Sequence, residues 1–331
     1  SIYRSMRVLS KARERSSMVE GILCLWFNRH MLSPSPNSTN KPFSRVALVG
    51  KFQADGIEEH LRDLAKMVSS LGCTVFLEAA TAQHLGLSEF PTKTAEDFAG
   101  AIDLVVVLGG DGTMLGIGRQ LAGKNVPLVG INMGRLGYMT DIPIQSVQSI
   151  LPQIIHGEYE ADTRTLLDAV VLRQGKEITR ALALNDVVVN RSGISGMVEL
   201  AVNVNGSFMY NQRSDGLIVS TPTGSTAYAL SAGGPILHPR VAGILLAPIA
   251  PHSLSNRPIV LPEDSVTIIE VVDGREVVVN FDMQSQTDLQ SGDQVEVRQS
   301  NKTITLLHPR SHSDYKTLRE KLHWNEYPST F

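Results

Sequence analysis

The chain has 331 residues and a mass of 36.0 kDa, which leaves room for two domains and a sizeable hydrophobic core. Its 42% hydrophobic and 19% charged residues are typical of a soluble globular protein, and no apolar run approaches the roughly 20 residues that a membrane-spanning helix needs. A formal net charge of −3 excludes the broad basic face that nucleic-acid binding requires, so we expect neither nucleic acid nor a membrane as a partner.

Residues 1–43 differ in composition from the rest of the chain. The first 40 residues hold six Arg or Lys against two Glu, which leaves 24 basic and 31 acidic residues, a net charge of −7, for residues 41–331. The apolar run at residues 22–27 is short and lacks the small-residue cleavage site of a signal peptide. We therefore expect residues 1–43 to be a disordered or non-native extension, with translation starting near Met31. Cys24 and Cys73 are too few for a disulfide framework and indicate a reducing, cytoplasmic compartment.

Residues 44–140 show the alternation of strands and helices that predicts a parallel sheet with crossover helices. The strand-like runs lie at residues 45–50, 73–77, 104–108 and 126–131, and the helical patterns lie at residues 57–71 and 113–121. Ligands bind such sheets outside the carboxyl ends of the strands. No G-x-G-x-x-G fingerprint follows the first strand, which argues against a standard NAD-dependent dehydrogenase.

From residue 141 onward the chain changes to short alternating or β-branched runs, separated by turn signals such as Asn205-Gly206. These runs lie at residues 167–172, 181–189, 197–204, 216–220, 266–271, 276–280, 294–298 and 303–307. They predict an all-β second domain over residues 141–302, near the start of which residues 147–155 form one helix. Residues 303–331 form a C-terminal tail, whose amphipathic helix at residues 315–324 we expect to return to the first domain.

The loop after the strand at residues 104–108 is the first candidate for chemistry. It reads Gly109-Gly110-Asp111-Gly112-Thr113, and glycines let backbone N–H groups approach a phosphate closely. The helix after Thr113 adds the positive end of its dipole. A carboxylate repels phosphate, so Asp111 would serve chemistry by accepting a proton or by holding Mg²⁺. The alternative is a tight turn in which Asp111 only caps the helix.

A second candidate is the polar pair Asn185-Asp186, which interrupts an otherwise apolar strand. Burying an amide and a carboxylate without partners is costly, so both side chains need hydrogen bonds. Backbone groups at a sheet edge could supply these bonds, and ribose hydroxyls or an adenine edge could supply them equally well. Both interpretations stay open at this point.

A third candidate runs from Arg213 to Tyr228 and joins an Arg/Asp pair to a hydroxyl-rich loop. Arg213 could hold a phosphate and Asp215 could accept a hydrogen bond from an amide or a ribose hydroxyl, although a plain surface ion pair is the alternative. Residues 220–228 offer backbone donors, hydroxyl donors and one aromatic ring within a short segment. No His, Cys or Glu spacing predicts a zinc site, and no Ser-His-Asp arrangement is supported.

Two long motifs carry a resemblance to a known family. They are GINMGRLGY at residues 130–138 and RSDGLIVSTPTGSTAYALSAGGP at residues 213–235, and PHSLSNRP at residues 251–258 supports them. With these motifs and the Gly-Gly-Asp-Gly loop, residues 44–324 resemble the bacterial ATP-dependent NAD kinases. The resemblance implies a Rossmann-like N-terminal domain with a parallel sheet, a β-sandwich C-terminal domain, and transfer of the ATP γ-phosphoryl group to the 2′-hydroxyl of the adenosine ribose of NAD.

The same resemblance assigns site residues. It makes Asp111 the proton acceptor in a phosphate loop that also contains Gly109, Gly110 and Thr113. The residues that it implies for binding NAD are Gly112, Asn185, Asp186, Arg213, Asp215, Thr226, Ala227, Tyr228, Ala229, Leu230, Ser231 and Gln284. It implies ATP and NAD as substrates, Mg²⁺ that accompanies ATP rather than a metal site of the protein, and a homo-oligomer, either a dimer or a tetramer.

Two competing functions remain open from the sequence. A lipid kinase could use the same glycine loop, but it should lack the Thr226-Ala227-Tyr228 run and would need an apolar acceptor pocket. A non-catalytic dinucleotide-binding regulator would bind NAD or NADP without forming NADP from ATP. One assay, with NAD and ATP as substrates and NADP as the product measured, separates all three functions.

Overall fold

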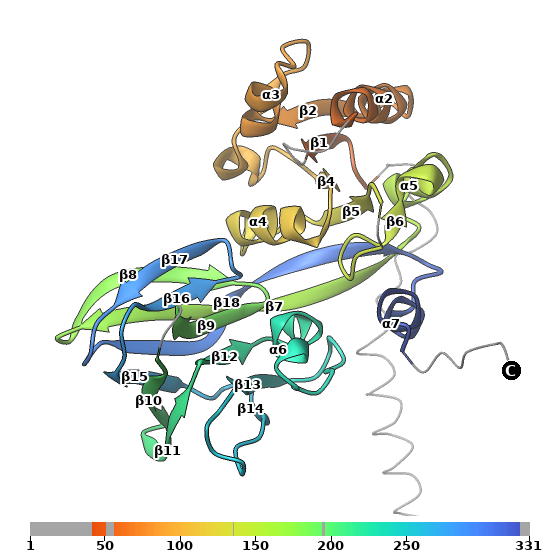
Figure 1. The fold of residues 1–331 in the computed structure, drawn as a ribbon. Helices are drawn as coiled ribbons and strands as arrows, with labels where there is room; N and C mark the ends of the chain where they lie inside the picture. Colours follow the sequence, from red (N-terminus) through yellow and green to blue (C-terminus); the bar gives the residue numbers. More distant parts are fainter. Residues whose placement is uncertain (1–41, 51–55, 135, 194–195, 325–331) are drawn as a thin grey trace, which may run out of the picture. The chain divides into compact units, whose positions relative to one another are not determined.

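The computed structural model describes residues 42–50, 56–134, 136–193 and 196–324 (Figure 1). The extension predicted at residues 1–43 therefore lies outside the described residues, apart from Pro42 and Phe43. Among the helices of the described ranges, none is long and apolar enough to cross a membrane.

The first part of the described chain is a parallel sheet flanked by helices. The strand order is β3-β2-β1-β4-β5, and all neighbours in this series pair parallel. Every residue of β4 and β5 is buried, which explains their continuous apolar sequences. The elements are β1 (Arg45–Gly50), α2 (Ile57–Ser70), β2 (Thr74–Glu78), α3 (Ala79–Leu85), β3 (Thr92–Lys93), η1 (Ala95–Phe98), β4 (Leu104–Leu108), α4 (Asp111–Leu121), β5 (Leu128–Asn132), β6 (Ile142–Pro143), η2 (Ile144–Ser146) and α5 (Val147–Ile155).

The second part forms two layers of antiparallel strands. One layer continues the parallel sheet in the order β11-β10-β15-β18-β5, with β7 and β8 attached to β18, and the other has the order β14-β13-β12-β9-β16-β17. The elements are β7 (Tyr159–Arg173), β8 (Lys176–Ala183), β9 (Asp186–Arg191), β10 (Val198–Val204), β11 (Ser207–Ser214), β12 (Gly216–Ser220), η3 (Thr223–Thr226), α6 (Tyr228–Ser231), β13 (Gly243–Ile249), β14 (Ile259–Pro262), β15 (Thr267–Asp273), β16 (Val277–Phe281), β17 (Ser285–Leu289), β18 (Gln294–Pro309) and α7 (Asp314–Leu322).

The strand β18 connects the two parts. Its residue Leu306 pairs parallel with Leu128 of β5, and most of its length pairs antiparallel with β7. The domain boundary predicted at residue 302 lies inside this strand, and the domain limits stay a prediction. After β18 the chain continues into α7, the last helix of the described residues.

A single hydrophobic core lies between the two layers of the second part. It contains Leu167 and Val297 from one layer and Val187 and Val219 from the other, all buried. Two antiparallel layers that share such a core form a β-sandwich. The predicted fold class, a Rossmann-like domain with a parallel sheet followed by a β-sandwich, is confirmed.

Candidate active site

Asp111 is the first residue of α4 and follows β4 and its two glycines. Gly110 occupies the N-cap position, and the hydrogen bonds of the Asp111 carboxylate go to other parts of the chain. The alternative in which Asp111 only caps the helix is therefore wrong.

The loop after β5 and the helix α7 hold the Asp111 carboxylate. Its Oδ2 accepts a hydrogen bond from Tyr138 N at 2.9 Å, and its Oδ1 accepts one from Met139 N at 3.0 Å. Lys321 Nζ lies 2.5 Å from Oδ2. Burial raises the pKa of Asp111, but Lys321 and the backbone amides outweigh burial, so the pKa lies below its ordinary value. The carboxylate is therefore ionised at neutral pH and can accept a proton, and 23% of its side-chain surface stays exposed to an incoming substrate.

Gly137 makes room for this carboxylate. A Cβ at Gly137 would collide with Asp111 Oδ1 and with Thr140 Oγ1. Thr140 also contributes two longer contacts of 3.3 Å to Oδ1, one from its N–H and one from its hydroxyl. The motif at residues 130–138 thus includes the end of β5 and also residues that hold the Asp111 carboxylate in position.

A cavity of about 480 Å³ opens at the glycine loop. A Cβ at Gly110 or Gly112 would meet nothing within 4 Å, and Gly110 has an extended backbone that other residues also adopt. Packing within the chain therefore does not require glycine at these two positions, and the surface of the loop stays open there. The N–H of Gly109 donates to Ile131 O at 2.9 Å, so it serves the sheet. The residues that line the cavity are Val49, Gly50, Glu78, Ala80, Gly110, Gly112, Thr113, Gly116, Ile117 and Gln120.

The turn at residues 281–284 connects the glycine loop to the β-sandwich. Gln284 Nε2 donates to Gly112 O at 2.6 Å, and Gln284 Oε1 accepts from Arg119 of α4 at 2.7 Å. Asp282 accepts three backbone hydrogen bonds, from the N–H groups of residues 184, 185 and 186, at 2.9, 2.7 and 3.1 Å. Sequence reasoning missed Asp282, because its partners are backbone groups almost 100 positions away along the chain.

The predicted pair Asn185-Asp186 lies at the start of β9, directly against this turn. Asp186 is 2% exposed, and within the described ranges its Oδ1 has no hydrogen-bond partner. Burial, followed by the charge of Asp282, raises the pKa of Asp186 to about 7. The alternative in which the chain itself satisfies the whole pair therefore fails for Asp186, because this buried oxygen has no partner among the described residues.

The hydroxyl-rich loop packs against Asn185. Thr221 N donates to Asn185 O at 2.9 Å, and Ser220 Oγ donates to the same oxygen at 3.2 Å. Gly224 permits this contact, because a Cβ there would collide with Asn185 O. Residues 226–231 continue from η3 into α6, where Ala229 is buried in the core while Thr226, Ala227, Tyr228, Leu230 and Ser231 keep exposed surface.

A second cavity, of about 200 Å³, is lined both by this loop and by Tyr138 of the segment that holds Asp111. Thr223 and Thr226 line it from the hydroxyl-rich loop, Tyr138 lines it from the loop after β5, and Tyr315 and Leu318 line it from α7. The structure thus brings the glycine loop, the Asn185-Asp186 pair and the hydroxyl-rich loop together through shared contacts.

Arg213 and Asp215 lie at the other end of β12 from the hydroxyl-rich loop. Arg213 is 3.9 Å from Glu199, and Asp215 pairs with Arg191 at 3.0 Å. Both residues form ion pairs, although with partners other than each other. Among the residues that the structure describes, no recorded interaction joins either of them to the glycine loop.

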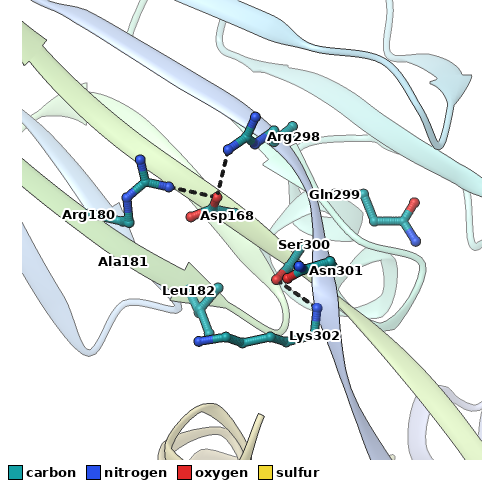
Figure 2. A pocket seen from close by; sticks show the side chains of 9 residues that line it. All are labelled: Asp168, Arg180, Ala181, Leu182, Arg298, Gln299, Ser300, Asn301 and Lys302. Carbon is teal, nitrogen blue, oxygen red and sulfur yellow. Dashed lines mark hydrogen bonds and ion pairs between the residues drawn. The ribbon is translucent and has the colours of Figure 1, made fainter. Parts of the chain in front are cut away.

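A larger cavity, of about 770 Å³, lies away from all of these residues, between β7, β8 and β18 (Figure 2). Arg180 and Arg298 reach into it, but both already contact Asp168, at 2.9 and 3.4 Å. None of the residues predicted for the site lines this cavity. Volume alone therefore does not identify the active site.

Two family models match the chain. The ATP-NAD kinase N-terminal domain matches residues 46–159, and the ATP-NAD kinase C-terminal domain matches residues 184–308. The NAD kinase of Cupriavidus pinatubonensis is 61% identical over 300 residues, which cover 90% of this chain and 98% of that protein. The NAD kinase of Ralstonia nicotianae is 58% identical over 293 residues, with 88% and 97% of the two chains covered.

Two solved structures are similar to the whole described fold. Yeast NADH kinase in complex with NADH has a TM-score of 0.79 at 27% identity and covers 90% of this chain and 95% of its own. An NAD kinase from Archaeoglobus fulgidus in complex with ATP has a TM-score of 0.68 at 25% identity, with 84% and 98% covered.

Proposed function

The chain belongs to the NAD kinase family, and we propose that it transfers the γ-phosphoryl group of ATP to the 2′-hydroxyl of the adenosine ribose of NAD, with Asp111 as the proton acceptor. The observation that carries the proposal is the turn at residues 281–284. It touches Gly112 on one side and residues 184–186 on the other, so a donor at the glycine loop and an acceptor at Asn185-Asp186 would lie next to each other.

In the proposed reaction, the 2′-oxygen of NAD forms a bond to the γ-phosphorus while the bond from that phosphorus to the bridging oxygen of ADP breaks. The hydroxyl proton passes to the Asp111 carboxylate. The triphosphate would occupy the cavity beside Gly110 and Gly112, where the positive end of the α4 dipole lies. Mg²⁺ enters as part of the substrate Mg·ATP. Positioning and charge stabilisation supply most of the catalysis in such transfers.

The β-sandwich would hold NAD. The unsatisfied Oδ1 of Asp186 supports a hydrogen bond with the adenosine part of NAD, and segment 226–231, which follows Gly224 at its contact with Asn185, would complete that site. Arg213 and Asp215 remain in the proposal as NAD contacts on the basis of the family motif alone. The proposal also includes a homo-oligomer, a dimer or a tetramer, and a cytoplasmic location, which the scarcity of cysteines supports.

The test is NADP formation from NAD and Mg·ATP by the purified chain and by Asp111→Asn. General-base help is worth about 10² to 10⁴ in rate, so the variant should lose turnover by that factor while it still binds NAD in calorimetry. Asp273→Asn, a change of an exposed acid on β15, is the matched control and should leave the rate unchanged.

Other outcomes would redirect the assignment. An Asp111→Asn variant that turns over at a near-normal rate would remove Asp111 from the role of proton acceptor. Binding of NAD without any NADP from ATP would favour the regulator, and phosphorylation of lipid but not of NAD would favour the lipid kinase.

A further inference from the structure

The helix α7 (Asp314–Leu322) returns to the start of α4 and delivers one cation to Asp111. The Ser313 side chain caps α7 by accepting a hydrogen bond from Lys316 N, and the helix residues Thr317 and Leu318 are buried. One turn beyond them, Lys321 Nζ reaches Asp111 Oδ2 at 2.5 Å, although the two residues are 210 positions apart in the chain. The same ammonium lies 4.2 Å from the centre of the Tyr138 ring.

The other end of α7 is anchored to the same loop that surrounds Asp111. His312, two residues before α7, lies with its Nδ1 2.8 Å from Asp141 Oδ2, and Asp141 follows Thr140 directly. His308 Nδ1 approaches the same oxygen at 2.9 Å, and the two imidazole rings stack at 4.0 Å. Both ends of the helix therefore contact the segment at residues 138–141, which limits how far Lys321 can move relative to Asp111.

Lys321 also stabilises the ionised form of Asp111, because its positive charge lowers the pKa of that carboxyl. Among the described residues, the charged and titratable groups recorded at Asp111 are Lys321 from α7 and Tyr138 from the loop after β5. Burial and the charge of Asp111 raise the pKa of Tyr138 to about 12, so its hydroxyl stays neutral and offers no charge. Without Lys321, the backbone amides and the Thr140 hydroxyl would have to offset the cost of burying the carboxylate.

We propose that Lys321 is a positioning residue for the phosphoryl transfer, which fixes the Asp111 carboxylate in the orientation that faces the acceptor hydroxyl. This inference rests on the proposed function, because it assigns Lys321 a role through Asp111. Lys321 keeps Oδ2 against the Tyr138 amide and leaves the exposed edge of the carboxylate for substrate. The C-terminal helix is in this way a part of the active site, although it lies outside the matched family segments.

The test compares Lys321→Met, which keeps the length of the side chain and removes the charge, with Lys321→Arg. Lys316→Met on the same helix is the matched control, because Lys316 is 62% exposed and contacts only Glu320 at 3.7 Å in the recorded ion pairs. Lys321→Met should lower kcat about 10-fold or more while the KM values for NAD and ATP change less than about 3-fold. Lys321→Arg should recover most of kcat, and Lys316→Met should match the parent chain.

The pH profile separates positioning from a merely structural role. Activity needs ionised Asp111 and is lost as pH falls through its pKa. Removal of the neighbouring cation raises that pKa, so the acidic limb of the kcat profile should move upward by about one pH unit or more in Lys321→Met. Melting temperatures, measured alongside, show whether α7 stays folded.

Two results would overturn the inference. The first is that Lys321→Met has the same kcat and the same acidic limb of the pH profile as the parent chain. The second is that kcat falls in Lys321→Met together with the melting temperature, and that Lys321→Arg does not restore it. The parallel Asp111→Asn variant keeps the two proposals apart. If Asp111→Asn is inactive and Lys321→Met is normal, only the role of Lys321 fails, whereas an active Asp111→Asn would remove the proposed role of Asp111 itself.

Discussion

Replacement of Asp186 with Asn should stabilise the fold at neutral and alkaline pH while it weakens NAD binding. Asp186 lies beside a second buried acid, Asp282, which accepts three backbone amides and has Arg119 Nε at 3.6 Å. Asp186 has no such support at its Oδ1. Burial raises the pKa of Asp282 as well, but the three amides and Arg119 oppose that rise, so Asp282 is better supported as an anion than Asp186.

The size of the effect follows from the pKa of Asp186, which burial and then Asp282 raise from 3.8 to about 7. Between these pH values the folded chain keeps a proton that the unfolded chain has released. The free energy of unfolding therefore falls as pH rises through this window, by about 1.4 kcal/mol for each pH unit. Across the whole window the loss approaches about 4 kcal/mol, and an amide at this position avoids it.

The assay is urea unfolding of the parent chain and Asp186→Asn at one protein concentration, from about pH 4 to pH 8. The variant should gain stability relative to the parent as pH rises, and the difference should level off above about pH 7. Asp273→Asn, with an exposed side chain, should show no such trend. A difference that stays constant with pH, or a parent chain that is the more stable at pH 8, would refute the reasoning. Calorimetry should show weaker NAD binding by the same variant.

Two further predictions concern the surroundings of Asp111. Gly137→Ala should lower kcat strongly, because the new Cβ would displace Asp111 Oδ1. Gly134→Ala should leave kcat unchanged, because a Cβ there meets nothing within 4 Å. Equal kcat values for the two variants would contradict this prediction. His312→Gln should remove a pH-dependent contribution to stability. Burial lowers the pKa of His312, but Asp141 and Asp314 raise it more strongly, to about 9. The resulting stabilisation is complete below the ordinary pKa of 6.5 and is lost as pH rises toward about 9. The free energy of unfolding in urea should therefore change more between about pH 6 and pH 9 in the parent than in the variant.

The fold was predictable where apolar runs are continuous and turns carry glycine. The predicted strand at residues 104–108 is β4 with the same bounds, and the predicted strand at residues 216–220 is β12. The runs at residues 294–298 and 303–307 were expected to be two strands, but they form the single strand β18. Ser300, Asn301 and Lys302 interrupt the apolar pattern, and a register shift against β7 between Gln299 and Thr303 absorbs the irregularity. A local bulge of this kind depends on the partner strand, which the sequence of β18 does not reveal.

The roles of the site residues stay a prediction, and the partners that the folded chain gives them were only partly predictable from the sequence. The glycines of the loop with Asp111 are visible in the sequence, whereas the hydrogen bond from Gln284, a residue that the resemblance assigns to NAD binding, to Gly112 O appears only in the folded chain. Lys321 follows the charged residues Arg319 and Glu320, Asp282 is a single acid after a strand, and nothing nearby distinguishes either from surface residues. Their partners are 210 and 96 to 98 positions away, so only the folded chain shows what they do.

The two acids of the proposed site have opposite electrostatic surroundings, and this difference assigns their chemistry. Asp111 has a cation and backbone amides at its oxygens, so it is an anion at neutral pH and can accept the ribose proton. Burial and then the charge of Asp282 raise the pKa of Asp186 to about 7, so below that pH it is mostly protonated and can donate a hydrogen bond. A site that needs one acceptor for the reacting hydroxyl and one donor for a neighbouring group can obtain both from Asp by this means. Burial is the larger cause of the raised pKa of Asp186, and the charge of Asp282 adds to it, so the depth of this part of the sandwich and its second acid together separate the two roles.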